Sequence, residues 1–134
     1  MTVMNIELKV STIMLGVKDV DRAKKFYAEG LGCEIEQDFP GFVKCSLGKG
    51  SSSLALYEWE AAAQDAGVSA EGSGFRGSSF HFITDSSDVV DEVMRTAAAA
   101  GGTVVKEATA AEWGGYFGYF SDPDGYLWKV TTAS

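Results

Sequence analysis

The side chains best suited to chemistry in this chain are a lone histidine, a lysine in the last apolar run and a dense group of aromatic rings. His81 is the only histidine among the 134 residues, and an imidazole can orient or deprotonate a ligand near neutral pH. Lys129, if its side chain is buried, would have a lowered pKa and could act as a base or form an imine. The rings between Trp113 and Trp128 suit stacking against a flat apolar molecule. Each group also has a plainer interpretation: a packed core histidine, a lysine that reaches solvent, and an unusually heavy aromatic core.

The aromatic residues are expected on two strands joined by a tight turn. The turn sequence Asp122-Pro123-Asp124-Gly125 has a proline suited to its second position and a glycine that supplies a positive φ. Alternation along the first strand places Tyr116 and Phe120 on one face and Phe117 and Tyr119 on the other. Whichever face looks inward therefore presents at least two rings.

Further residues are expected near these rings. Trp113 precedes two glycines, which favour a bulge or hinge that lets its indole lie over a cavity. Phe39 and Phe42 flank an earlier Pro-Gly turn and can face Trp113 across a cavity or across a dimer. Gly118 has no side chain and is expected to leave room for a flat molecule against its strand.

Short strands and two main helices must position these residues. Besides the aromatic hairpin, alternation and β-branched residues predict strands over 6–17, 33–39, 42–47, 52–57, 79–84 and 103–107. Helical spacing predicts a first helix from an Asp19 N-cap to Gly30, and a second helix capped by Asp85 or Ser87 and stopped by Gly101-Gly102. A short helical piece is expected at 59–65.

The two halves of the chain repeat one order of strand, helix and three strands. Val17 aligns with Thr84, and Phe26 aligns with Val93. We predict an α+β fold of one domain, 1–134, with two tandem βαβββ modules at about 6–58 and 77–132 and a linker at about 59–76. Since each unit is too small to bury its own sheet face, the two are expected to form a half-open mixed-sheet cup with helices outside.

Composition excludes several classes of protein. Eleven Lys and Arg against 19 Asp and Glu give a net charge of −8, so nucleic acid is not an expected partner. The longest apolar runs are far shorter than the ~20 residues of a membrane span, and no signal-peptide pattern is present. We therefore expect a cytoplasmic protein without membrane association. Cys33 and Cys45 lack a CxxC spacing and are predicted to be reduced, packed thiols.

Several short motifs occur together in the chain: Val17-Lys18-Asp19-Val20, Arg22, Phe26-Tyr27, Leu31-Gly32 and the turn Asp122-Pro123-Asp124-Gly125 with the apolar strand after it. In these motifs the chain resembles the vicinal oxygen chelate superfamily of glyoxalases, bleomycin-resistance proteins and extradiol dioxygenases. The resemblance extends from about Thr12 to Thr132 and implies the paired βαβββ scaffold. Lyases, isomerases, dioxygenases, thiol transferases and metal-free antibiotic-binding proteins share that scaffold, so the resemblance specifies fold more closely than function.

The resemblance also implies where metal ligands would lie. Metal-dependent members use one ligand from the first and one from the fourth strand of each module, which correspond here to Thr12, Leu54, Ser79 and Lys129. Two hydroxyls, an isobutyl group and an ammonium cannot supply the lone pairs and negative charge that a divalent ion requires. His81 shares a strand face with Ser79, but one imidazole without companion carboxylates is a poor site. We predict neither a metal nor another cofactor.

We predict a binding protein, a homodimer whose cups hold an aromatic or polycyclic small molecule by stacking, as the resemblance to the bleomycin-resistance branch implies. The predicted ligand-binding residues are Phe39, Phe42, His81, Trp113, Tyr116, Tyr119 and Lys129. The alternative is a metal-independent lyase or isomerase in which His81 or Lys129 moves a proton. A divalent-metal glyoxalase-type lyase is the third hypothesis. Whether the modules pair within one chain or swap between two chains stays open.

Overall fold

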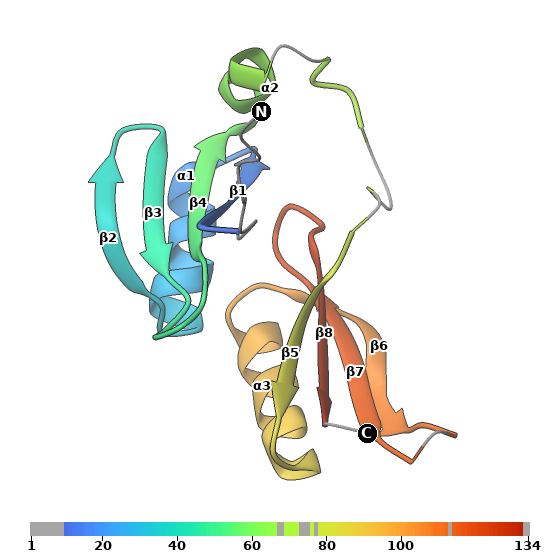
Figure 1. The fold of residues 1–134 in the computed structure, drawn as a ribbon. Helices are drawn as coiled ribbons and strands as arrows, with labels where there is room; N and C mark the ends of the chain where they lie inside the picture. The colour runs from blue at the N-terminus through green and yellow to red at the C-terminus, as the bar shows by residue number, and fades with distance from the viewer. Residues whose placement is uncertain (1–9, 67–68, 73–75, 77, 113, 133–134) are drawn as a thin grey trace, which may run out of the picture.

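The protein is described by a computed structural model that covers residues 10–66, 69–72, 76, 78–112 and 114–132. The first module comprises β1 (Thr12–Val17), α1 (Val20–Lys24), the π-helical segment η1 (Lys25–Gly30), β2 (Glu34–Phe39), β3 (Phe42–Ser46) and β4 (Ser53–Glu58). Helix α2 (Trp59–Ala66) follows. The second module comprises β5 (Phe80–Thr84), α3 (Ser87–Ala99), β6 (Thr103–Ala110), β7 (Tyr116–Ser121) and β8 (Leu127–Thr132), as Figure 1 shows.

Each module folds into an open, four-stranded mixed sheet. Sheet A has the strand order β1-β4-β3-β2, and sheet B has the order β5-β8-β7-β6. The first and last strands of each module are parallel, because a helix connects the first strand to the rest, whereas the short turns make the other neighbours antiparallel. The predicted α+β fold of two βαβββ modules is confirmed. In the described residues β1 and β5 are outer edge strands, and no strand pairing joins the two sheets.

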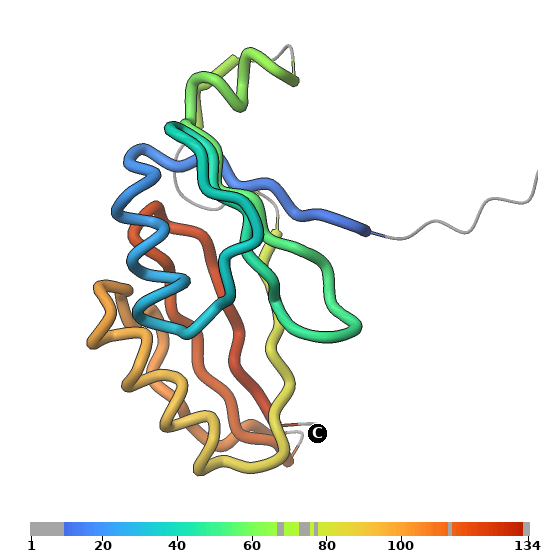
Figure 2. The backbone as a smooth tube through the Cα atoms, turned by 90° about the vertical axis from the view of Figure 1, so that its left-hand side faces the viewer, coloured from blue at the N-terminus to red at the C-terminus, as the bar shows by residue number. Residues whose placement is uncertain are grey.

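The helices α1, η1 and α3 cover one face of the sheets. Figure 2 shows α1 with η1 and α3 one above the other along one side of the molecule. Helix α3 buries the stripe formed by Val90, Met94 and Ala97, the spacing expected of an amphipathic helix. We call the opposite face of each sheet its open face. In the described part of the chain, no helix is long and apolar enough to cross a membrane.

Side-chain caps determine where the helices begin. The Asp19 carboxylate accepts a hydrogen bond from the Arg22 N–H at 3.1 Å, which confirms the predicted cap of α1. The prediction for α3 was wrong by one residue, because Ser86, rather than Asp85 or Ser87, has the extended backbone of an N-cap. Its hydroxyl accepts from the Val89 N–H at 3.3 Å.

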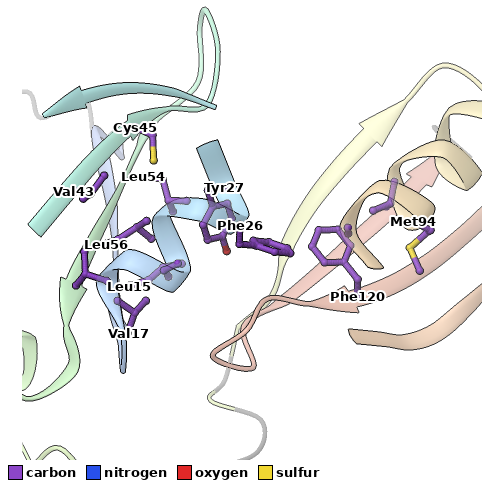
Figure 3. Close-up of a cluster of buried hydrophobic side chains, with 14 of the residues drawn as sticks. Leu15, Val17, Phe26, Tyr27, Val43, Cys45, Leu54, Leu56, Met94 and Phe120 are labelled. Atoms are coloured by element: carbon purple, nitrogen blue, oxygen red, sulfur yellow. The ribbon is translucent and has the colours of Figure 1, made fainter. Parts of the chain in front are cut away.

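The hydrophobic core crosses the boundary between the modules. Phe26 and Tyr27 of η1 point from the first module toward Phe120 of β7, as Figure 3 shows. The ring centroids of Phe26 and Phe120 lie 6.2 Å apart, and those of Tyr27 and Trp128 lie 6.3 Å apart. Because Phe26, Tyr27 and Phe120 are each at most 2% exposed, the modules share one core.

A buried hydrogen-bond network also connects the modules. The Tyr27 hydroxyl donates to Asp122 Oδ2 at 2.8 Å and accepts from Trp128 Nε1 at 3.1 Å. The other carboxylate oxygen, Oδ1, accepts from the N–H groups of Asp124 and Tyr126, both at 2.9 Å. Asp122 is 2% exposed, and burial raises its pKa despite these donors. The Asp-Pro-Asp-Gly turn is therefore a structural connection between the two modules.

The second aspartate of the turn holds the start of α1. Asp124 Oδ1 accepts from the Lys18 N–H at 2.8 Å and from Arg22 Nη2 at 2.9 Å. Nearby, the Tyr126 hydroxyl donates to the Gly16 carbonyl oxygen at 2.8 Å. The residues that carry the family resemblance in the first half thus contact those that carry it in the second half.

Candidate functional site

Strand register decides which side chains reach the open face of sheet B. Phe120 is buried on the helix side, so its neighbour Tyr119 points to the open face. In register, His81 on β5 lies beside Lys129 on β8, Lys129 lies beside Tyr119 on β7, and Tyr119 lies beside Lys106 on β6. These four residues, which we call the cross-strand row, span all four strands of sheet B.

The rings and cations of this open face contact one another. Phe117 and Tyr119 pack edge to face, with ring centroids 6.2 Å apart. Lys106 Nζ lies 4.7 Å from the centroid of Phe117, and Lys129 Nζ lies 4.8 Å from it. Both distances suit a cation–π interaction. Because the two lysines lie on the strands flanking β7, the open face is an aromatic surface with an ammonium group supplied from each side.

Tyr116 and Gly118 belong to the opposite side of the sheet. The Tyr116 hydroxyl donates to Asp91 Oδ1 of α3 at 2.7 Å, and this bond raises the pKa of Tyr116. Tyr116 and Tyr119 therefore lie on different faces, and only Tyr119 accompanies Lys129. A Cβ atom on Gly118 would lie 3.1 Å from the backbone of Ala108. The expectation that Gly118 leaves room for a flat ligand was wrong, since β6 fills that space.

Sheet A has a smaller aromatic group on its open face. Phe42 and Tyr57 are register partners on β3 and β4 and pack edge to face with centroids 5.5 Å apart. Phe39 lies opposite Phe42 at the end of the β2–β3 hairpin, and 59% of it is exposed. Elsewhere in the sheet, Glu36 Oε1 accepts from the Ser53 hydroxyl at 2.8 Å. Phe39 and Phe42 thus lie on the other module from the cross-strand row.

His81 lies at the rim of the open face. It is exposed, so the interpretation as a packed core histidine is excluded, and its Nε2 lies 3.2 Å from the Ser79 hydroxyl. It also lines an apolar recess of about 420 Å³ between the modules, together with Ile13, Leu54 and Trp128 among others. Trp113, the remaining predicted ligand-binding residue, lies outside the described residues.

The positions that correspond to the family's metal ligands do not fit a metal. Leu54 is fully buried on the helix side of β4, so the fourth-strand position that reaches the open face is not Leu54 but a residue next to it. Its neighbours Ser53 and Ala55 face the open side, beside Thr12 and Met14 of β1 respectively. A hydroxyl or a methyl group adds no anionic ligand. Among the described residues, no three His, Cys, Asp or Glu side chains are grouped closely enough to hold a metal ion.

Two contributors to the open face were missing from the predicted site. Phe117 was assigned to the same face as Tyr119 by alternation but was not selected as a ligand contact. Lys106 was not among the predicted ligand-binding residues. It lies beside Tyr119 because β6 has two irregularities, between Val104 and Lys106 and between Lys106 and Thr109. Alternation counted along an unbroken strand does not locate such bulges.

Comparison with known families and structures agrees with this architecture. The family model described as "Glyoxalase/Bleomycin resistance protein/Dioxygenase superfamily" matches residues 9–130. No curated protein sequence matches the chain. A glyoxalase-related enzyme from Fulvimarina pelagi has a similar structure, with a TM-score of 0.82 and 28% identity over 92% of this chain and 87% of that one.

Two other solved structures share the fold at lower identity. The hypothetical protein SA1046 from S. aureus has a TM-score of 0.81 and 22% identity over 96% of each chain. Lactoylglutathione lyase from Agrobacterium tumefaciens has a TM-score of 0.71 and 24% identity, also over 96% of each chain. These similarities extend over the whole paired-module architecture and concern fold alone.

Proposed function

We propose that this chain, which belongs to the Glyoxalase/Bleomycin resistance protein/Dioxygenase superfamily, binds an aromatic or polycyclic small molecule without using a metal ion. The observation that carries the proposal is the contact between Lys129 and Phe117. Where metal-dependent relatives are expected to place their last ligand, this chain has an ammonium group 4.8 Å from the centroid of a ring on the open face. An ammonium repels a divalent ion, whereas the adjoining rings suit a flat organic ligand.

The proposed binding site includes Phe117 and Tyr119 from sheet B. Each ring that stacks on a ligand adds about 0.5–1.5 kcal/mol beyond the burial of apolar area. Lys129 and His81 border these rings in the cross-strand row. Tyr116 is excluded from this set, because its hydroxyl is bound to Asp91 on the helix side.

We further propose that two chains form a symmetric dimer through their edge strands. Strands β1 and β5 each have an outer edge without a partner strand in the described structure, and such edges pair readily with another chain. Large apolar side chains are exposed there, with Met14 on β1 at 40%, Phe82 on β5 at 46% and Ile83 on β5 at 62%. If β1 of one chain pairs with β5 of its partner, sheet A of one chain and sheet B of the other enclose one cup. Phe42 would then face the rings of sheet B.

Calorimetric titration with 2-naphthamide, a flat neutral probe, tests the binding function. We expect Phe117→Ala and Tyr119→Ala each to weaken binding about fivefold or more. Val89→Ala serves as the control, because Val89 is an exposed apolar residue of α3, away from the proposed site and from the edge strands. Equal affinity in all four proteins would contradict the proposal. Stoichiometric zinc, nickel or iron in elemental analysis of the purified protein would contradict its metal-free part.

A metal-independent lyase or isomerase is the second candidate, favoured by the position of His81 beside Lys129 on one face. The similar structure from Fulvimarina pelagi is described as a glyoxalase-related enzyme. In this alternative either residue moves a proton on a carbonyl substrate. If the protein is such an enzyme, His81→Ala or Lys129→Met should abolish turnover of its substrate. Both variants should leave the affinity for 2-naphthamide unchanged, which separates catalysis from binding. A divalent-metal lyase ranks third.

A further inference from the structure

The cross-strand row combines an aromatic surface with a concentration of positive charge. Two of its four side chains, Lys129 and Lys106, are ammonium groups, and the other two are Tyr119 and the imidazole of His81. Both ammonium groups approach the ring of Phe117 in the adjacent row, at 4.7 and 4.8 Å. Cationic and aromatic groups thus occupy one continuous part of the open face of sheet B.

The charge on this face is opposite to that of the whole chain. Acidic residues outnumber Lys and Arg by 19 to 11, yet none of the residues that strand pairing places on the open face of sheet B is acidic. Glu107 of β6 lies on the other side, where it lines a recess with Asp91 and Arg95 of α3. A region of positive potential within an acidic protein raises the local concentration of anions.

We propose that the ligand of this face is a planar aromatic acid, with a ring that lies against Phe117 and Tyr119 and a carboxylate that accepts hydrogen bonds from Lys106 and Lys129. The proposal rests on the binding function above and specifies its ligand class. A charge-assisted hydrogen bond to a carboxylate is stronger than a cation–π contact at an exposed site. The lysines can therefore turn from the ring of Phe117 to an acid group while the aromatic rings keep the ligand in place.

Paired titrations with 2-naphthoate and 2-naphthamide test the inference, because the two probes have nearly the same shape and differ in charge. We expect the wild-type protein to bind the acid about tenfold more tightly than the amide. Lys106→Met and Lys129→Met should each weaken binding of the acid several-fold and leave binding of the amide unchanged. The control is Lys25→Met, which makes the same change in net charge at an exposed position on the helix side. It should affect neither probe.

The outcomes separate this inference from the binding function. Equal affinity for the two probes, or equal losses in the Lys25 and Lys129 variants, would refute the acid preference while leaving aromatic binding intact. Weakening of both probes by Lys129→Met would also refute it, because the lysine would then support the rings rather than the carboxylate. Failure of both probes to bind the wild-type protein would overturn the proposed function together with this inference. Circular dichroism confirms that each variant is folded.

Discussion

Replacing Asp122 with alanine should strongly destabilise the protein. Three donors lose their acceptor in this variant: the hydroxyl of Tyr27 and the N–H groups of Asp124 and Tyr126. Each buried donor left without a partner costs about 1–3 kcal/mol. Since the two N–H groups are only partly buried, we take about 1 kcal/mol for each of them. The buried Tyr27 hydroxyl adds at least about 1 kcal/mol, so we expect a loss of about 3 kcal/mol or more. For a domain of this size, that loss lowers the melting temperature by about 10 °C.

A double-mutant cycle tests whether the Tyr27–Asp122 bond itself is responsible. Urea unfolding gives the free energies of wild type, Asp122→Ala, Tyr27→Phe and the double variant. Both single variants lose the same bond. The sum of their two losses of unfolding free energy should therefore exceed the loss in the double variant by about 1 kcal/mol. Asp65→Ala, at an exposed position near the end of α2, is the control and should change stability by about 0.5 kcal/mol or less. Additive losses, or a loss below about 1 kcal/mol for Asp122→Ala, would refute the reasoning.

Three further predictions concern pH, packing and assembly. Burial raises the pKa of Asp122 above its ordinary value of 3.8, so the folded state binds the proton more tightly than the unfolded state. The stability of the wild-type protein should therefore fall as the pH rises from 3.8 through the folded pKa. Asp122→Asn should lack this component, and pH-dependent urea unfolding that shows the same profile for both proteins would disprove it. Gly102→Ala should cost about 1–3 kcal/mol, because its Cβ would lie 2.8 Å from the Ser121 carbonyl oxygen; an unchanged melting temperature in calorimetry would contradict this contact. Ile83→Lys should convert the proposed dimer to a monomer in light scattering, whereas Val89→Lys, at an exposed apolar position of α3, should not; a wild-type monomer, or a dimer that survives Ile83→Lys, would argue against pairing through β5.

Local sequence patterns predicted the elements well because they depend on neighbouring residues. Alternation assigned Phe117 and Tyr119 to one face of β7, and the register shows them there. The Asp-Pro-Asp-Gly turn and the Asp19 cap were also recognised from nearby residue types. Asp85, Ser86 and Ser87 all have side chains that can cap a helix, so residue type alone does not identify the N-cap of α3. The structure uses Ser86 rather than either predicted residue.

Long-range contacts were beyond the reach of such patterns. The motif alignment equated Leu54 with a metal-ligand position of the fourth strand, whereas packing against the helices buries Leu54 completely. The bulges of β6 brought Lys106 beside Tyr119. The turn aspartates were predicted as parts of a hairpin, but their carboxylates also bind Tyr27 and Arg22 in the other module. Each of these depends on how distant segments meet in three dimensions.

The bonds of the Asp-Pro-Asp-Gly turn have a kinetic consequence. Tyr27 and Asp122 are 95 residues apart in the chain, and Gly16 and Tyr126 are 110 residues apart. Contacts so distant form late, because closing a long loop costs entropy before any contact compensates for it. During synthesis on the ribosome, Tyr27 therefore lacks its acceptor until nearly the whole described chain has been made. The first half cannot complete its native contacts before then. Completion of the native structure is then a late event controlled by the arrival of one short turn.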